Sequence, residues 1–190
     1  MMKALKAATS ARHAALEARL PLLRADLSLA TYQHYVQRLF GFYQPLEHQL
    51  AHAPGRSEVA LDYASRQKTP RLLQDLQVLG DSLEGIARLP RCTALPPLTT
   101  AAQLWGCLYV IEGASLGGQI ILRQLHAHLG LTVQSGASFF DGYGRHTAAQ
   151  WKAFCAAMPL QANQSATEQA AMLVSANCTF ELLGDWLFSD

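Results

Sequence analysis

The chain has 190 residues, of which 50% are hydrophobic and 15% are charged, and its formal net charge is +1. This length and composition predict one globular domain over residues 1–190 rather than a disordered chain, and without a basic block no nucleic-acid binding is expected. Because the sequence has no signal-peptide core, no apolar run of about 18 residues and no CxxC pair, we expect a cytoplasmic protein with reduced cysteines and no membrane span.

The first half of the chain has apolar residues at the spacing of α-helices. Three helices are predicted here, over residues 3–20, 28–53 and 69–80. Ser28 is a suitable N-cap for the second helix, and Pro45 is expected to kink or divide it. Thr69 followed by Pro70 has the pattern of a cap and a first-turn proline. The stripe predicted to be buried in the second helix is Tyr32, Tyr35, Val36, Leu39, Tyr43, Leu46 and Leu50.

The second half follows a proline-rich loop at residues 89–98 and is also helical. Helices are predicted over residues 100–129, 148–158 and 165–188, and the glycine-rich residues 131–144 are predicted to be a loop with at most a short extended piece. Gly130 is placed to end the first of these helices. Thr147 with Gln150, and Ser165 with Glu168, have the spacing of capping boxes. The fold class is therefore all-α, a helical bundle of about seven or eight helices.

Three glycines lie within six residues of the long helix predicted over residues 100–129, at Gly113, Gly117 and Gly118. Each glycine inside a helix costs roughly 0.5–1 kcal/mol relative to alanine, so the cluster requires a reason. One interpretation is close packing of another helix. The other is a flat ligand that lies across bare backbone, with a kink making room for it.

His13 shares a helical stripe with Thr9, Leu16 and Leu20, so its side chain is expected to face the core. A neutral imidazole there is either a hydrogen-bonded core residue or a metal ligand whose other nitrogen is held by an acceptor such as Glu17, four residues later. Lys6 lies seven residues earlier on the same side, a rise of roughly 10 Å, about the span from a porphyrin centre to a propionate.

Together these segments resemble the heme oxygenase family. Lys6 to Glu17 is similar to the family's proximal helix, with the lysine, the threonine four before the histidine, and the ligating histidine. Leu108 to Gln119 is similar to its distal helix. The resemblance continues through Phe139-Phe140, residues 151–154 and residues 176–180, and so covers nearly the whole chain. The glycine segment is most similar to that of bacterial members, including those that accompany bacterial phytochromes.

The resemblance implies that heme is both cofactor and substrate, held between the two helices with His13 as the axial iron ligand. Gly113, Gly117 and Gly118 would let the distal backbone approach the other face. Dioxygen and an external electron donor, a reductase or a ferredoxin, would then yield biliverdin, carbon monoxide and ferrous iron. A bacterial phytochrome is a possible acceptor of the biliverdin. A monomer is expected, although the residues do not determine the oligomeric state.

Lys6 matches the family's propionate-binding lysine, and Lys152 matches a second basic position that Arg145 would assist. The alternative for Lys152 and Arg145 is a solvated surface charge. Animal-type members carry an aspartate directly after the first glycine, where this chain has Ala114. The resemblance therefore requires another group to hold the distal water, such as Ser115, Glu112 or a side chain from another helix.

Two rival functions remain open. A heme-binding carrier or sensor would keep the fold without degrading heme, and Ala114 favours it. A helical protein of similar architecture that acts on other small molecules would need no axial histidine, so His13 in its matching context argues against that function. His48 and His52 have a spacing that could bind a metal, but without a carboxylate partner a polar helix face is the favoured interpretation.

Overall fold

The computed structural model describes residues 1–159 and 164–189. Within them, the segments with helical spacing of apolar residues form helices. These residues form eight α-helices and no strand, which confirms the all-α prediction. The helices are α1 (Met2–Glu17), α2 (Leu29–His52), α3 (Thr69–Val78), α4 (Leu83–Arg88), α5 (Ala101–Leu129), α6 (Ser138–Asp141), α7 (Thr147–Ala157) and α8 (Ala166–Phe188). Short 3-10 turns cover Pro21–Leu23, Pro54–Glu58, Ala64–Arg66, Val133–Ser135 and Gly144–His146.

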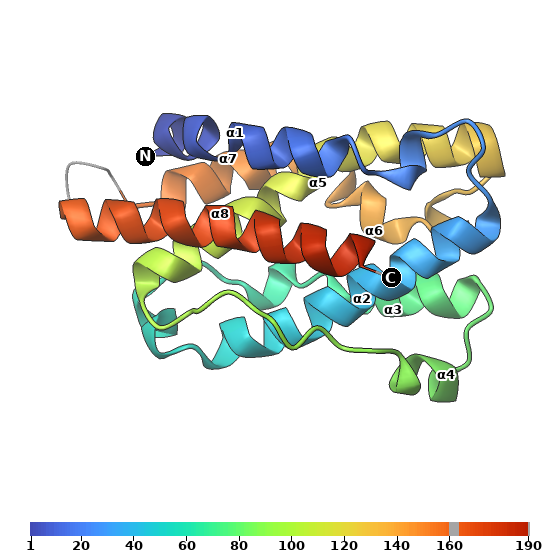
Figure 1. The fold of residues 1–190 in the computed structure, drawn as a ribbon, viewed down its shortest axis with the longest axis horizontal. Helices are drawn as coiled ribbons and strands as arrows, with labels where there is room; N and C mark the ends of the chain where they lie inside the picture. The colour runs from blue at the N-terminus through green and yellow to red at the C-terminus, as the bar shows by residue number, and fades with distance from the viewer. Residues whose placement is uncertain (160–163, 190) are drawn as a thin grey trace.

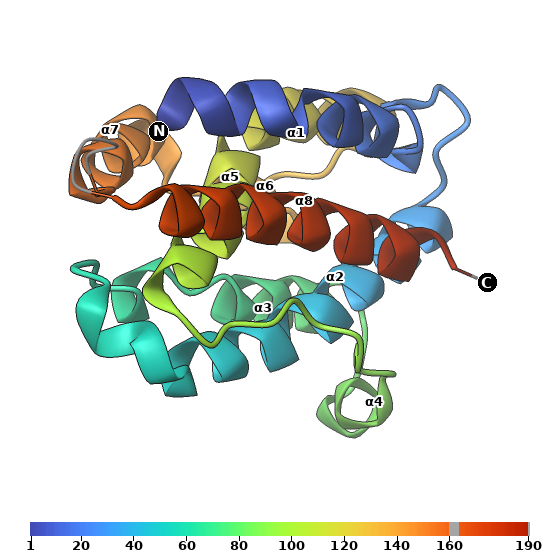
Figure 2. The same ribbon diagram turned by 60° about the vertical axis from the view of Figure 1, so that its left-hand side comes forward.

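The long helices lie in layers. In Figures 1 and 2, α8 runs between α1 on one side and α2 with α3 on the other. The central helix α5 packs along α8 and crosses obliquely from the level of α2 toward that of α1. In both views the C-terminal half of α5 runs in the same direction as α1 and on the same side of the molecule. Yet α1 and α5 are not closely packed on each other, since each is held mainly by α8.

The core forms where the apolar stripes of α2, α5 and α8 meet. All seven residues predicted for the buried stripe of α2 are buried. Pro45 does not divide α2, which is continuous from Leu29 to His52. Of the two outcomes expected at Pro45, a kink or a break, the break is therefore wrong, because burial of both faces of α2 outweighs the one hydrogen bond that the proline cannot donate.

Two predicted N-caps take other roles. Thr69 and Thr147 are the first residues of α3 and α7 rather than their caps, and neither makes a side-chain cap. At α3 the side chain of Glu47, from α2, accepts the backbone N–H groups of Lys68 and Thr69. At α7 the hydroxyl of Thr147 binds the turn before the helix, donating to Gly144 O and accepting from Tyr143 N. The local capping pattern therefore did not form at either helix: at α3 a residue distant in sequence binds the free N–H groups, and at α7 the threonine binds the preceding turn.

The ends of α5 and α8 agree with the sequence. Thr100 with Gln103, and Ser165 with Glu168, both form complete capping boxes. Gly130 ends α5 in the left-handed conformation, with φ +67°. Among the described residues α5 alone has the length and composition to cross a membrane, but half of its most apolar window is buried in the protein, as in the core helix of a globular domain.

Three local predictions differ from the structure. Helix α1 ends at Glu17 rather than Leu20, because a 3-10 turn at Pro21–Leu23 follows it. Residues 131–144 contain the short helix α6 and 3-10 turns instead of an extended piece. Helix α4 was not predicted; its six residues are too short for a periodic apolar pattern, and the N-cap Ser82 is its main local signal.

Candidate functional site

Gly106, Gly113 and Gly117 lie on one face of α5, which is covered at one end and bare at the other. A Cβ at Gly106 would come within 2.3 Å of the backbone oxygen of Met172, so α8 packs directly on the helix there. Two turns later, a Cβ at Gly113 would meet only the Trp151 ring, at 3.7 Å. A Cβ at Gly117, one further turn along, would meet no other segment of the described chain within 4 Å. The face that α8 covers at Gly106 is therefore open from Gly113 onward.

Apolar side chains border the bare backbone. Leu116 is 44% exposed and Ile120 is 53% exposed, and both lie within one turn of Gly117 on the same side of α5. A helix of a folded protein normally buries such a stripe, since uncovered apolar side chains lose the free energy of burial. We define Gly113, Leu116, Gly117 and Ile120 as the open face of α5.

Two residues predicted to belong to this site lie elsewhere on the helix. A Cβ at Gly118 would be 2.2 Å from the backbone oxygen of Phe140, so this glycine admits α6 and not a ligand. For Gly118 the helix-packing interpretation is the right one. Ser115 lies against Gly142, where the nearest atom to an added Cβ would be the Ser115 Cβ at 3.3 Å. Both residues are offset from Gly117 around the helix, which explains why different neighbours cover them.

Helix α1 contributes His13, one turn beyond its contact with α5. Burial raises the pKa of Tyr109 on α5, and a hydrogen bond with the buried Thr9 of α1 opposes that rise. Since Thr9 and His13 are four residues apart, the imidazole is on the side of α1 that reaches α5. Its Nδ1 lies 3.3 Å from Oε2 of Glu17, and its ring meets Phe180 of α8 edge-on.

The prediction that His13 is buried was wrong, because its side chain is 54% exposed. Its helical stripe gives the direction of the side chain correctly, since Leu5 and Thr9 on that stripe are buried. Burial depends in addition on neighbouring elements, and the edge of Phe180 on α8 covers the imidazole only in part. An exposed imidazole with one nitrogen held by a carboxylate leaves its other nitrogen available to a ligand.

The basic residues predicted to bind the ligand are on the surface. Lys6 and Lys152 are exposed and have no salt-bridge partner within the described ranges. Arg145 is also exposed, and its side chain contacts His146. Trp151, which precedes Lys152, stands against Tyr109, so α7 borders the junction of α1 and α5. These positions suit mobile cations around an opening and do not by themselves define a site.

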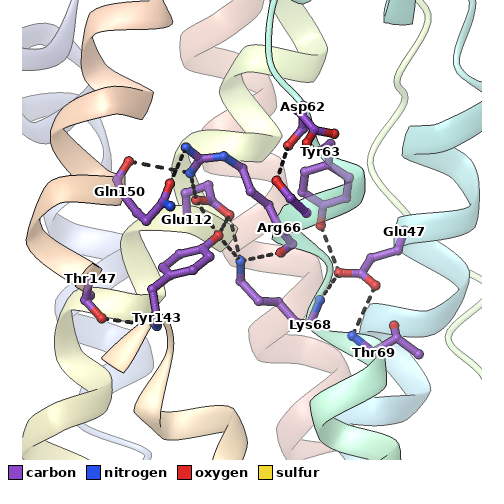
Figure 3. A network of polar contacts seen from close by, with 11 residues as sticks. Glu47, Asp62, Tyr63, Arg66, Lys68, Thr69, Glu112, Tyr143, Thr147 and Gln150 are labelled. Atoms are coloured by element: carbon purple, nitrogen blue, oxygen red, sulfur yellow. Dashed lines mark hydrogen bonds and ion pairs between the residues drawn. The ribbon is translucent and has the colours of Figure 1, made fainter. Parts of the chain in front are cut away.

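A buried polar cluster adjoins the open face, and the sequence analysis did not find it (Figure 3). The side chain of Glu112, next to Gly113, has no exposed surface. Its carboxylate lies 2.7 Å from Nη1 of Arg66 and 2.7 Å from Nζ of Lys68. The hydroxyl of Tyr143 lies 2.9 Å from each carboxylate oxygen, and Gln150 accepts from Arg66 at 2.8 Å. We call Arg66, Lys68, Glu112, Tyr143 and Gln150 the Glu112 cluster.

Burial changes the ionisation of the cluster. It lowers the pKa of Lys68, an effect that the adjacent Glu112 opposes. Burial also raises the pKa of Tyr143, and the negative charge of Glu112 raises it further, so this hydroxyl stays neutral and donates. One sequence signal could have found the cluster. Glu112 ends an almost wholly apolar stretch of α5 that begins at Leu104, and a carboxylate on a buried helix needs a cationic partner.

Comparisons with known proteins agree with the resemblance seen in the sequence. A family model described as heme oxygenase matches residues 1–189. A heme oxygenase of Xanthomonas campestris is 35% identical over 118 residues, which cover 60% of this chain and 64% of that protein, less than two thirds of its length.

Two solved structures share the fold. The heme oxygenase of Leptospira interrogans superposes with a TM-score of 0.77 at 18% identity, covering 96% of each chain. Heme oxygenase-1 of the cyanobacterium Synechocystis, solved in complex with heme, superposes with a TM-score of 0.73 at 18% identity, covering 97% of this chain and 89% of that one.

Proposed function

The chain belongs to the heme oxygenase family, and we propose that it binds heme between α1 and the open face of α5 and cleaves the ring. The single observation that carries the proposal is the open face of α5, where a Cβ at Gly117 would meet no other segment of the described chain and the apolar side chains of Leu116 and Ile120 are about half exposed. A flat, largely apolar ring would cover that face. It would supply the burial that the protein itself does not provide.

The side chains near the open face fit an iron porphyrin. His13 would be the axial iron ligand through the nitrogen that Glu17 does not hold. Glu17 would fix the orientation of the His13 imidazole. Lys6 would contact a propionate about two turns away, with Lys152 and Arg145 as further basic contacts. Gly113 and Gly117 would admit the ring to the backbone. Gly118 supports this arrangement only indirectly, by seating α6 against α5.

The heme would supply the oxygen-binding centre and be the molecule that is opened, to biliverdin with release of carbon monoxide and ferrous iron. Dioxygen and an external reductase or ferredoxin would be required. The protein would orient the ring, limit which edge is accessible and restrict water. Because Ala114 carries no polar group and Ser115 lies against Gly142, a water on this side would depend on backbone groups of α5 or on a side chain from another helix. A bacterial phytochrome would be a suitable acceptor of the product.

A second function has one observation in its favour. The open face of α5 consists of glycine and aliphatic residues, and Ala114 adds no hydrogen-bonding side chain beside it. A face with so few polar groups would bind heme in a carrier or sensor without helping oxygen chemistry. The two functions make the same prediction for binding and different predictions for turnover.

A hemin titration followed by reduction under air tests both functions. Wild-type protein is expected to give the absorption band of histidine-bound hemin and then, with ascorbate or a ferredoxin system, the broad absorption of biliverdin. His13→Ala should lose the histidine-type band and the turnover, whereas His128→Ala, which removes an exposed histidine at the far end of α5, should behave as wild type. A wild-type band that persists through reduction, with the reductant checked on a known enzyme, would establish the carrier. No binding of hemin would overturn both functions.

A further inference from the structure

Among the contacts that hold helix α5, three are spaced six residues apart and enclose its exposed turn or precede it. At Gly106 it is fixed by the backbone of α8, and at Gly118 by the backbone of α6. The remaining place is Glu112, where the contacts are ionic. Between Glu112 and Gly118 no residue is buried: positions 113–117 are all at least partly exposed. This turn contains two glycines, so it has both weak helix propensity and little side-chain packing.

The Glu112 cluster connects α5 to three other segments. Arg66 and Lys68 come from the segment that enters α3, Tyr143 from the turn before α7, and Gln150 from α7 itself (Figure 3). The backbone N–H of Lys68 is held in turn by Glu47 of α2, which also accepts the hydroxyl of Tyr63. The carboxylate of Glu112 is thus a common point of contact for elements that otherwise belong to separate layers.

The groups of the cluster are closely paired. Nζ of Lys68 makes three contacts, to Arg66 O, Glu112 Oε1 and the Tyr143 hydroxyl, which use its three protons. One oxygen of Glu112 accepts from Arg66 and the other from Lys68, and the single proton of the Tyr143 hydroxyl is shared between them at 2.9 Å from each oxygen. Because the Glu112 side chain has no exposed surface, the role of holding a distal water, considered from the sequence, does not suit it. Any displacement of α5 would instead separate buried charges in a medium of low dielectric constant, which is costly.

We propose that Glu112 is a positioning residue: through Arg66, Lys68 and Tyr143 it fixes the glycine-bearing turn of α5 and so sets where the open face stands relative to α1. The proposal deepens the proposed function, since the consequence for catalysis rests on heme being the ligand. The consequence for the ligand-free protein does not depend on which ligand is bound. Without the cluster, the open face of α5 should still form, but it should no longer be held in one position.

The first test uses the ligand-free protein and does not involve heme. Tyr143→Phe removes one hydroxyl from the cluster and keeps the ring, so the variant should fold. Amide hydrogen exchange at residues 113–117 is expected to rise about tenfold, with exchange in α8 unchanged, because opening would be local. Tyr32→Phe is the matched control, since it removes a buried tyrosine hydrogen bond, to Gly136 O, that involves no residue of the Glu112 cluster, and it should leave residues 113–117 unaltered. Equal changes in both variants, or none in Tyr143→Phe, would overturn the proposal.

The second test uses hemin and the products of turnover. If the turn sets the register of the ring, Tyr143→Phe should bind hemin within about twofold of wild type yet yield a mixture of biliverdin isomers where wild type yields one, and its bound-hemin spectrum should broaden. The Tyr32→Phe variant should keep the wild-type isomer. An unchanged isomer pattern and spectrum in Tyr143→Phe would overturn the role in positioning the ring. Failure of wild type to bind hemin would refute the proposed function, while the exchange result would still decide the role of Glu112 in fixing α5.

Discussion

Gly106 and Gly117 lie on the same face of α5, three turns apart. The backbone of α8 closes on the first, while a Cβ at the second would meet no other segment within 4 Å among the residues that the structure describes. One helix face thus serves two purposes along its length. At Gly106 the missing side chain allows two helices to touch, and at Gly117 it leaves an opening. The difference arises because α8 contacts α5 at one end of this face and not at the other.

Alanine at the two neighbouring glycines Gly117 and Gly118 should have opposite effects on stability. Gly117→Ala is expected to raise the free energy of unfolding by about 0.5–1 kcal/mol, since the methyl group meets no atom and alanine favours helix. Gly118→Ala is expected to lower it by about 1–3 kcal/mol, because its Cβ would lie 2.2 Å from the Phe140 oxygen. Urea unfolding of the ligand-free variants measures both. Destabilisation of similar size in the two variants would contradict this description of α5.

Serine in place of Leu116 or Ile120 should affect ligand binding far more than folding. Both side chains are about half exposed, so each substitution should cost less than about 1 kcal/mol of stability. Hemin affinity should fall about tenfold, the equivalent of roughly 1.4 kcal/mol of lost apolar contact. Val174→Ser on α8 is the control, because Val174 is 67% exposed and lies away from the open face. If all three variants bind hemin as wild type does, the ligand does not lie on this face.

Removal of the Glu112 charge should be among the most destabilising conservative changes in the chain. Glu112→Gln leaves Arg66 and Lys68 buried beside a neutral amide, and the free energy of unfolding should fall by about 3–5 kcal/mol. Adding Lys68→Met should recover part of that loss, because one cation then leaves together with the carboxylate. A double-mutant cycle by urea unfolding measures the coupling. Strict additivity of the two substitutions would show that the charges do not interact as the structure implies.

Stability should fall steeply at alkaline pH. Burial raises the pKa of Tyr32, Tyr35, Tyr43 and Tyr63, and it raises that of Cys107 to about 12. A tyrosine whose folded pKa is raised stabilises the fold fully below its unfolded pKa of about 10. That contribution is lost as pH rises, at about 1.4 kcal/mol per pH unit for each group. Lys68, whose pKa burial lowers, acts in the opposite direction but is a single group.

The variant Tyr35→Phe checks this pH dependence, since burial is the cause of the Tyr35 shift. Thermal unfolding between about pH 8 and 11 should give a shallower decline for this variant than for wild type, by the contribution of one tyrosine. The slope is the quantity to compare, because the substitution also changes the stability at neutral pH. An identical slope in the two proteins would mean that Tyr35 ionises in the folded state.

Local sequence was sufficient for most of the helices. The apolar spacing of α2 predicted each buried residue of its stripe, the capping box at Ser165 predicted where α8 begins, and Gly130 predicted where α5 ends. These features depend on residues within one or two turns of each other, so neighbours in sequence carry the information. The open-face residues Gly113 and Gly117, and His13 with Glu17, were found for the same reason.

Tertiary structure alone decided which of these faces are covered. Gly117 and Gly118 are adjacent, yet one is bare and the other is pressed against Phe140, and His13 lies on the stripe of a core residue yet is exposed.

The Glu112 cluster was missed because Arg66 and Lys68 are more than 40 residues away in sequence from Glu112, and Tyr143 is 31 residues away. Helical periodicity gives the direction of a side chain, whereas burial and charge pairing depend on which distant segment the fold places opposite it.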